Sequence, residues 1–189
     1  MDRLEKYAKE NNIPIMQKDG MLFLMEYIKK NKVKNILEIG SAIGYSAINM
    51  ANVSEDIFVT TIERDKERYK QALKNIKDYN LDSRITVIYA DALTIDIKEQ
   101  YDLIFIDAAK AQYIKFFEKY KNNLKKDGTI ISDNLYFHGL TKKPDAIKSK
   151  NLRALVKKIN NYKIFLEKNK EFTTEFLTIG DGIAISKRK

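Results

Sequence analysis

The stretch NILEIGSAIGYSAINMA, residues 35–51, decides the fold class of this chain. Its first five residues, Asn35 to Ile39, read as a short buried strand, and a turn bearing Gly40 and Gly44 follows. The run after the turn is helical in character as far as Ala51. A strand that leads through a glycine turn into a helix is the opening unit of an α/β fold.

The same alternation continues along the rest of the chain and ends in a hairpin signal around Gly180-Asp-Gly182. Strands that alternate with helices predict a mostly parallel sheet covered on both faces, and the hairpin adds an antiparallel strand at its edge. The segment Thr129–Ser132 is predicted to be a strand reached through a turn at Asp127-Gly128. Further strands are predicted at 58–62, 84–89, 101–106, 173–179 and 183–186, and further helices at 2–11, 20–31, 65–79, 112–124 and 152–166.

Composition describes one globular domain of 189 residues, with 44% hydrophobic and 32% charged residues. The absence of cysteine excludes disulfides, thiolate zinc sites and a cysteine nucleophile. No apolar stretch approaches the roughly 20 residues that a membrane span needs. The charged N-terminus, MDRLEKYAKENN, lacks the apolar core of a secretion signal. A cytoplasmic protein without a membrane partner is therefore expected.

The formal net charge of +9 is unevenly distributed. Between Leu140 and Lys170 ten basic residues stand against two acidic ones, Asp145 and Glu167. Clustered lysines attract phosphates without reading sequence, so a nucleic-acid contact surface is one interpretation. A solvated helix face in a lysine-rich protein is the other.

Candidate functional residues follow the ends of the predicted strands, where α/β sheets bind their ligands. The first strand ends in the spacing E-x-G-x-x-x-G, from Glu38 to Gly44, which lacks the G-x-G-x-x-G fingerprint of dinucleotide folds. Glu63, after the second strand, could accept hydrogen bonds from both hydroxyls of a ribose. Asp91, after the third, could accept one from the amine of adenine. The alternatives are ordinary caps, with Asp65 as the expected helix cap and Asp91 capping a turn.

The fourth and fifth strands end in Asp107 and in Asp133-Asn134. Adjacent strands would bring these three side chains together as an all-oxygen set, which suits Mg²⁺ or another hard cation such as Mn²⁺. Lys110 follows close enough to act as a general base. The alternatives are a turn at Asp133, a helix cap at Asp107 and an exposed Lys110.

These motifs resemble the metal-dependent class I S-adenosylmethionine O-methyltransferases, the group of catechol and caffeoyl-CoA methyltransferases. The matching text is ILEIGSAIGYSAINMA, TIERD, YADAL, YDLIFIDAAK and IISDN, and the tail GDGIAI fits the last hairpin of the family. The resemblance implies a Rossmann-like seven-stranded sheet in a single domain over residues 1–189. Residues 1–32 would form N-terminal helices packed over the cofactor and substrate side. The chain is short at its N-terminus beside the family, so one capping helix is expected to be missing.

The resemblance also assigns roles to residues. Lys110 and Asp107 would be catalytic, and Asp107, Asp133 and Asn134 would hold the metal. The segment Pro14–Gly20 resembles the part of the family that approaches the methionine end of the cofactor. The residues implied in cofactor binding are Met16, Glu38, Gly40, Tyr45, Ser46, Glu63, Asp91, Ala92 and Asp107.

Within the family the chain is most similar to the bacterial branch that methylates 5-hydroxyuridine at the tRNA wobble position. Catechol and 5-hydroxyuracil both carry two vicinal oxygens that can chelate one divalent cation, so one site could serve either. The partner would be a tRNA anticodon stem-loop, and a homodimer is expected from the family. Ala108 and Ala109 replace bulkier residues of catechol methyltransferases. Candidate RNA contacts are Lys142, Lys143, Lys148, Lys150 and Arg153, and His138 has no assigned role.

Three further hypotheses stand beside tRNA methylation. A small-molecule O-methyltransferase for vicinal diols would use the same site, although the absence of Trp argues against an aromatic gate over a flat substrate. A non-catalytic RNA-binding or nucleotide-sensing protein would not require Asp107, Asp133, Asn134 and Lys110 together. A dehydrogenase would need the glycine fingerprint that is missing.

Overall fold

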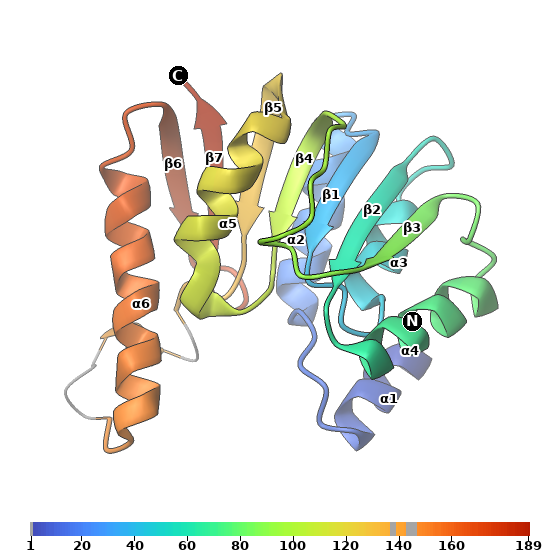
Figure 1. The fold of residues 1–189 in the computed structure, drawn as a ribbon, viewed down its shortest axis with the longest axis horizontal. Coiled ribbons are helices and arrows are strands. Elements are labelled where there is room, and N and C mark those ends of the chain that lie inside the picture. Colours follow the sequence, from blue (N-terminus) through green and yellow to red (C-terminus); the bar gives the residue numbers. More distant parts are fainter. Residues whose placement is uncertain (1, 137–138, 143–146) are drawn as a thin grey trace.

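A computed structural model describes residues 2–136, 139–142 and 147–189 of the chain. Seven strands form one sheet in the order β3-β2-β1-β4-β5-β7-β6 (Figure 1). Strands β1 to β5 pair in parallel, and β7 runs antiparallel to both of its neighbours, β5 and β6. The predicted α/β fold with a mostly parallel seven-stranded sheet and an antiparallel hairpin strand is confirmed. The strands are β1 (Asn35–Ile39), β2 (Phe58–Glu63), β3 (Ile85–Tyr89), β4 (Tyr101–Ile106), β5 (Leu124–Ser132), β6 (Phe172–Leu177) and β7 (Ile183–Arg188).

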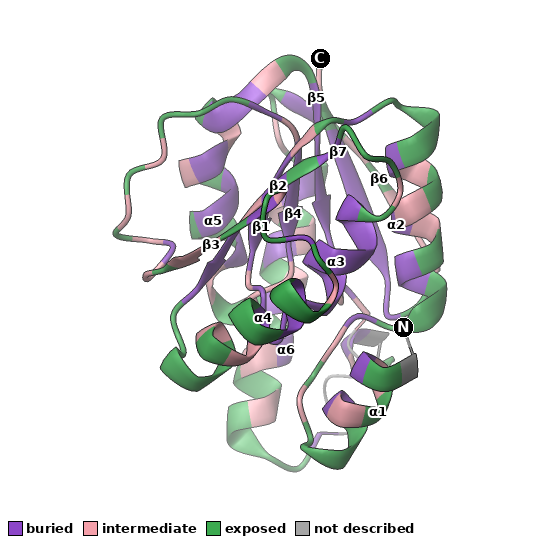
Figure 2. Cartoon of the chain, turned by 90° about the vertical axis from the view of Figure 1, so that its right-hand side faces the viewer, coloured by how far each residue is buried: buried purple, intermediate pink, exposed green. Residues whose placement is uncertain are grey.

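Helices cover both faces of the sheet because successive strand residues point to opposite sides. In β1, Ile36 packs with α1 to α4 on one face, and Leu37 packs with α5 and α6 on the other. Figure 2 shows the buried strands between helices whose outer surfaces are exposed. The helices are α1 (Asp2–Glu10), α2 (Lys18–Lys30), α3 (Tyr45–Ala51), α4 (Lys66–Asp78), α5 (Tyr113–Tyr120) and α6 (Lys150–Glu167), with 3₁₀ turns at Lys110–Gln112, Lys121–Asn123 and Leu140–Lys142.

The N-terminal helix α1 and the beginning of α6 both lie at the end of the sheet where the parallel strands finish (Figure 1). Helix α1 is held there by the buried side chains of Leu4 and Ala8. In α6 the buried residues begin only at Val156, so its first turn extends past the core. The carboxyl ends of the parallel strands thus lie at the same end of the molecule as α1 and the beginning of α6.

The fifth strand differs from its prediction. It begins at Leu124 and includes Asp127-Gly128, which the sequence predicts as a turn before the strand. Its pairing with β4 shifts register after Tyr101, which marks a bulge. A Cβ on Gly128 would lie 3.0 Å from the backbone oxygen of Asp102, so glycine is needed for the close approach of the neighbouring strand. The glycine therefore marks a bulge inside the strand.

Two local predictions are also decided by the structure. Asp65 caps α4, because its side chain accepts hydrogen bonds from the backbone nitrogens of Glu67 and Arg68, as expected. The helix predicted at 112–124 is shorter, since α5 ends at Tyr120 and passes through a 3₁₀ turn into β5. Among the helices in the described ranges, none is long and apolar enough to cross a membrane.

Candidate active site

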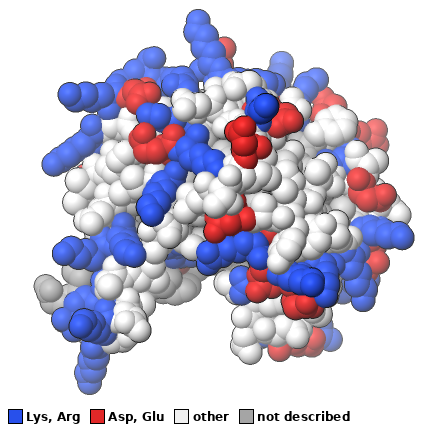
Figure 3. Space-filling model, viewed as in Figure 1, with Lys and Arg blue, Asp and Glu red and all other residues white. Residues whose placement is uncertain are grey.

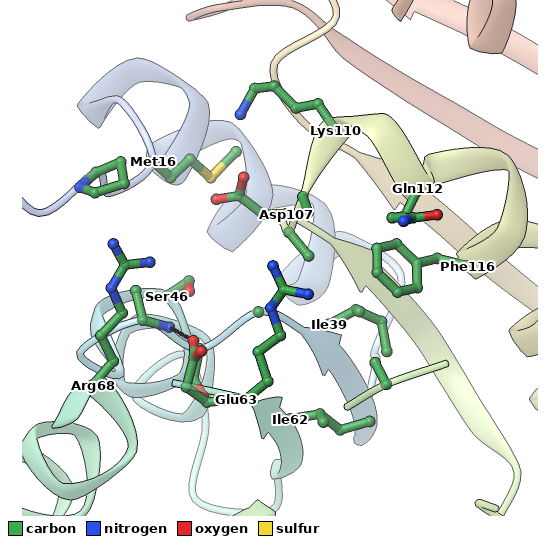
Figure 4. A pocket seen from close by; sticks show the side chains of 18 of the residues that line it. Met16, Ile39, Ser46, Ile62, Glu63, Arg68, Asp107, Lys110, Gln112 and Phe116 are labelled. Atoms are coloured by element: carbon green, nitrogen blue, oxygen red, sulfur yellow. Dashed lines mark hydrogen bonds between the residues drawn. The ribbon is translucent and has the colours of Figure 1, made fainter. Parts of the chain in front are cut away.

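A cavity of about 490 Å³ opens at the carboxyl ends of β1 to β4. Its walls come from residues 14–17, the turn between β1 and α3, and the segments that follow β2, β3 and β4, with Asn134 after β5. Figure 4 shows Met16, Asp107 and Lys110 around one end and Glu63, Arg68 and Ile62 toward the other. The topology thus collects in one place the strand ends that the sequence singles out. Of the predicted site residues, the cavity is lined by Met16, Gly40, Tyr45, Ser46, Glu63, Asp91, Ala92, Asp107, Lys110 and Asn134.

The floor of the cavity depends on Gly40. Its φ of +100° lies in the left-handed region that favours glycine. A Cβ at this position would lie 2.5 Å from the backbone oxygen of Asp107, so the turn after β1 can contact the end of β4 only without a side chain. Next to it, the Ser41 hydroxyl lines the cavity, is buried and has no hydrogen-bond partner among the described residues. An unpaired buried hydroxyl of this kind fits a ligand-binding wall.

Glu63 is held in place by backbone donors. The backbone nitrogens of Ala42 and Asp65 donate to its two carboxylate oxygens at 2.9 and 2.8 Å. The side chain is buried but lines the cavity at the end of β2. Each carboxylate oxygen keeps a lone pair for another donor. This geometry can receive the two vicinal hydroxyls of a ribose.

Asp91 caps its turn and also lines the cavity. One carboxylate oxygen accepts a hydrogen bond from the backbone nitrogen of Leu93 at 2.8 Å, so the residue does cap its turn. The other lies 4.0 Å from a guanidinium nitrogen of Arg64, at the cavity wall. Ala92 is buried and contributes an apolar surface beside Ile62. This end of the cavity suits a flat apolar ring with polar edges.

Glu38 does not line the cavity, although it belongs to the predicted cofactor-binding residues. It is fully buried beneath the cavity, where it accepts hydrogen bonds from the hydroxyls of Ser46 and Thr61, the latter at 2.6 Å. Burial raises the pKa of Glu38 to about 7, and the two hydroxyl donors oppose this rise. Ser46, which does line the cavity, donates its hydroxyl hydrogen bond to Glu38, so its oxygen can act only as an acceptor toward a ligand.

The N-terminal segment forms one wall of the cavity. Met16 is almost fully buried and lines the wall together with Pro14 and Gln17. The phenol of Tyr45, also in the wall, donates a hydrogen bond to Glu5 of α1 at 2.8 Å. Helix α1 is therefore connected to the cavity by the side chain of a lining residue.

The candidate metal ligands come together as the sequence predicts. Ile106 pairs with Ser132 at the ends of β4 and β5, and the following residues share one edge of the sheet. The amide nitrogen of Asn134 donates to Asp133 at 2.8 Å and to Asp107 at 3.4 Å. The same amide, turned about its last torsion, would present its oxygen to this point. Asp107 does not cap the next helix, whose N-cap is Ala109.

The electrostatics of this trio fit a divalent cation. Burial, then repulsion from Asp107, raises the pKa of the Asp133 carboxyl to about 8, and burial also raises the pKa of Asp107. A bound cation would neutralise two carboxylates that otherwise disfavour each other's ionisation. In the part of the chain that is described, no group of three or more His, Cys, Asp or Glu side chains could hold a metal. The candidate donors are therefore two carboxylates and one amide, a hard oxygen set.

Lys110 begins the 3₁₀ turn after β4 and lines the same end of the cavity. It is half-buried, and its positive charge lowers the pKa of Asp107 against the effect of burial. Its side chain is labelled beside Asp107 in Figure 4. An amine in this place could take a proton from a group bound next to the metal ligands.

Of the predicted RNA-contact residues, Lys148, Lys150 and Arg153 do not line the cavity. Lys148 and Lys150 are exposed at the start of α6. The Arg153 guanidinium donates twice to the backbone oxygen of Ile147, at 3.2 and 2.9 Å, so it holds the loop to the helix. The backbone of Lys142 belongs to a 3₁₀ turn but its side chain is outside the described part, as are Lys143 and His138.

Several cavity-lining residues are missing from the set that the sequence suggests, among them the polar or large side chains of Ser41, Arg64, Arg68, Gln112 and Phe116. Arg64 and Arg68 read as surface charges of a helix start, and Phe116 as one apolar position of a helix. Arg64 follows Glu63 directly, which is the one signal that could have identified it. Gln112 and Phe116 reach the cavity only because α5 packs beside β4.

Comparison with known proteins gives a consistent result. The family model described as O-methyltransferase matches residues 1–189. Tapetum-specific methyltransferase 1 of Arabidopsis thaliana is 31% identical over 195 residues, covering 98% of this chain and 82% of the relative. A proposed caffeoyl-CoA O-methyltransferase from Staphylococcus aureus superimposes with a TM-score of 0.95 at 41% identity, over 100% of this chain and 91% of that one. An O-methyltransferase from Bacillus cereus, solved in complex with SAH, superimposes with a TM-score of 0.84 at 25% identity, over 100% and 90%.

Proposed function

The chain belongs to the O-methyltransferase family, and on that premise we propose that it methylates the 5-hydroxyl of 5-hydroxyuridine at the tRNA wobble position. The methyl donor is S-adenosylmethionine, in keeping with the SAH-bound relative from Bacillus cereus. The product would be 5-methoxyuridine. The single observation that carries the choice of acceptor is a cationic wall, by which we mean the basic residues at the beginning of α6, with Lys148, Lys150 and Arg153.

The cavity fits the cofactor. Glu63 would hold the ribose, and the apolar surface of Ile62 and Ala92 would receive the adenine. Met16 and Tyr45 lie toward the N-terminal wall, where the methionine end would be enclosed. When bound, S-adenosylmethionine supplies a methyl group on a sulfonium sulfur, which leaves as the thioether. The protein has only to position and desolvate it.

Asp107, Asp133 and Asn134 would hold a divalent cation, Mg²⁺ or Mn²⁺. When bound, the cation would act as a Lewis acid toward the acceptor oxygens. Lys110, at the same end of the cavity, would take the proton of the acceptor hydroxyl at its Nζ atom. Positioning of acceptor and donor supplies the rest of the rate enhancement.

The choice of an RNA acceptor rests on charge and access. Helix α6 carries five basic residues and one acidic residue, Glu167, and its beginning lies at the end of the sheet where the parallel strands finish. Figure 3 shows the surface hollowed between this wall, which is rich in Lys and Arg, and the opposite wall of mixed charge. Phosphates of an anticodon loop would follow the cationic wall while the unstacked wobble base enters the cavity. Ala108 and Ala109 leave the entrance lined by small side chains.

A small vicinal diol is the second candidate acceptor. The Staphylococcus aureus neighbour is described as a proposed caffeoyl-CoA O-methyltransferase, an enzyme class with a phenolic acceptor. Both acceptors carry two neighbouring oxygens that could ligate a cation held by Asp107, Asp133 and Asn134. The two candidates differ in whether the cationic wall contributes to binding.

The deciding experiment measures methyl transfer from labelled S-adenosylmethionine into tRNA that carries 5-hydroxyuridine. The controls are tRNA without the hydroxyl, the same reaction with EDTA, and catechol as acceptor. We expect incorporation that requires both the hydroxyl and the divalent cation. Methylation of catechol without methylation of tRNA would assign the protein to the small-molecule acceptor and would contradict the RNA proposal. The expected homodimer stays a prediction that sedimentation can measure.

A further inference from the structure

Two buried tyrosines contact the segment that carries two of the candidate metal ligands. Tyr113 begins α5 and Tyr162 belongs to α6, and both side chains are almost fully buried. Neither of them lines the cavity. Their rings meet edge to face, with centroids 5.2 Å apart and an interplanar angle of 81°. The two helices are therefore joined through these rings.

Each phenol hydroxyl holds a different point of the chain at the end of β5. The Tyr113 hydroxyl donates to the backbone oxygen of Asp133 at 3.1 Å. The Tyr162 hydroxyl shares a hydrogen bond of 2.7 Å with the hydroxyl of Ser132, the last residue of β5. The backbone nitrogen of Asp133 donates to the backbone oxygen of Ile106 at 3.2 Å. Both backbone polar groups of Asp133 are thus engaged, one with β4 and one with α5.

The peptide that joins Asp133 to Asn134 carries the carbonyl that accepts from Tyr113. Because a peptide is planar, the direction of this carbonyl sets the backbone from which both side chains project. Asn134 has a φ of +67°, in the left-handed region that asparagine tolerates better than most residues. Beyond it, the backbone nitrogen of Leu135 donates to the backbone oxygen of Gly182 at 3.0 Å. Rotation of the peptide would therefore displace both candidate ligands.

Packing alone does not require these two hydroxyls. Tyr113 and Tyr162 belong to the apolar cluster on the α5 and α6 face of the sheet, where phenylalanine would bury nearly the same surface. A buried hydroxyl costs free energy unless it is hydrogen-bonded, and here each one meets its partner at the end of β5. What the hydroxyls add is a fixed direction of the chain at Ser132 and Asp133.

We propose that Tyr113 and Tyr162 are positioning residues for the divalent cation, because through Asp133 and Ser132 they fix the peptide from which two of its ligands project. Neither tyrosine is itself a ligand. Outer partners of this kind hold the ligands in their binding geometry and so raise the affinity for the metal. The inference rests on the metal site of the proposed function and does not depend on which acceptor is methylated.

The test is a titration with Mn²⁺ in the presence of saturating SAH, with the free ion measured by electron paramagnetic resonance. We expect Tyr113→Phe to weaken Mn²⁺ binding by about tenfold, the lower end of what the loss of an outer partner costs. Tyr162→Phe should weaken it by a smaller factor, because Tyr162 contacts the residue before Asp133. Calorimetric titration should give both variants the SAH affinity of the wild type, since neither tyrosine lines the cavity.

Tyr120→Phe is the matched control. Tyr120 lies on the same helix as Tyr113, is likewise buried, and donates its hydroxyl hydrogen bond to the backbone oxygen of Ala92. This variant loses one buried phenol hydroxyl but no printed contact to residues 132–134, so its Mn²⁺ affinity should equal that of the wild type. Equal losses of Mn²⁺ affinity in Tyr120→Phe and Tyr113→Phe would overturn the proposal, because a loosened core would then be the cause.

Ser132→Ala tests the second route. If Tyr162 acts through Ser132, the combination of Tyr162→Phe with Ser132→Ala should lose no more Mn²⁺ affinity than the larger of the two single losses. Fully additive losses would contradict the role of Ser132 in transmitting the effect of Tyr162.

The outcomes separate this inference from the proposed function. A wild-type protein that does not bind Mn²⁺ would overturn the metal assignment itself. If the wild type binds Mn²⁺ and Tyr113→Phe binds it equally well, the positioning role is overturned and the metal assignment stands. A loss of SAH affinity in Tyr113→Phe as large as its loss of Mn²⁺ affinity would also overturn the positioning role, because the whole cavity would then be disturbed.

Discussion

Glu38 shows how a single residue can belong to a site without facing it. The sequence places it two residues before Gly40, and the structure places its carboxyl under the cavity, enclosed by the hydroxyls of Ser46 and Thr61. Burial raises its pKa to about 7 although both hydroxyls donate to the carboxylate, because the loss of solvation is the larger effect. The residue thereby fixes the direction in which the Ser46 hydroxyl donates.

Glu38→Gln should change how stability depends on pH. The folded-state pKa of Glu38 is raised above the ordinary value of 4.5. Its contribution to the free energy of unfolding is therefore fully present below pH 4.5 and is lost as the pH rises toward about 7. Between these values the wild type should lose on the order of 2–3 kcal/mol relative to Glu38→Gln. Urea denaturation of both proteins at pH 5 and pH 8 measures the difference. Parallel stability curves would show that Glu38 ionises normally.

Lys110→Ala tests the proton acceptor. We expect kcat to fall by about 10²–10⁴-fold, the usual contribution of a positioned general base, and the pH dependence of kcat to change shape. Lys115→Ala is the matched control, because Lys115 is exposed on the following helix and does not line the cavity. A pH–rate profile with the wild-type shape in Lys110→Ala would remove Lys110 from the role of base.

At the scale of elements, α1 is a short peripheral helix that packs against the rest of the domain near the cavity. It is attached through the buried Leu4 and Ala8 and through the hydrogen bond from Tyr45 to Glu5. The segment that follows it contributes residues 14–17 to the cavity wall. Because few contacts hold a short helix at the edge of a domain, its undocking should cost less free energy than global unfolding.

Leu4→Ala should loosen α1 and weaken cofactor binding together. The loss of a fully buried leucine costs about 2–5 kcal/mol, enough to undock a short peripheral helix. We expect faster amide hydrogen exchange over residues 2–17 and a several-fold weaker affinity for SAH. Lys6→Ala, on the exposed side of the same helix, is the control. Wild-type SAH affinity despite increased exchange would show that α1 does not cover the bound cofactor.

At the scale of the whole molecule, the exposed lysines near the beginning of α6 and the candidate catalytic residues occupy different regions. The candidate metal ligands Asp107 and Asn134 line the cavity together with Lys110 and Glu63, whereas the exposed Lys148 and Lys150 at the beginning of α6 do not. A long polyanion can contact both regions at once, and a small phenol can contact only the first. Ionic strength therefore distinguishes the two kinds of acceptor.

Reversing the charges of Lys148 and Lys150 to Glu should weaken tRNA binding and flatten its salt dependence. The slope of log K against log salt should decrease in magnitude by about 1–2, as expected for two lost phosphate contacts. Filter binding between 50 and 200 mM salt, about the range over which such contacts are screened, measures it. Lys29 and Lys30, exposed in the last turn of α2, provide the control pair. An unchanged slope would reduce the α6 wall to a solvated face.

The sequence by itself determined the order of strands and helices and the strand ends at which the candidate site residues lie. Local periodicity suffices for this, because a buried strand and an amphipathic helix differ in repeat within a few residues. The edge shared by Asp107, Asp133 and Asn134 followed from the rule that parallel strands finish at one side of a sheet. The tail around Gly180-Asp-Gly182 likewise predicted the antiparallel hairpin.

Only the tertiary structure decided what depends on distance between segments far apart in the chain. Gly128 reads as a turn in isolation but is a bulge, because the backbone of Asp102 lies against it. Glu38 was placed below the cavity by packing, while Arg64 and Phe116 were brought into its wall by the pairing of β2 with β3 and the docking of α5. The residues adjacent in sequence do not determine how far a side chain is buried or which side chains it contacts. Both depend on contacts between distant segments that form only when the sheet assembles.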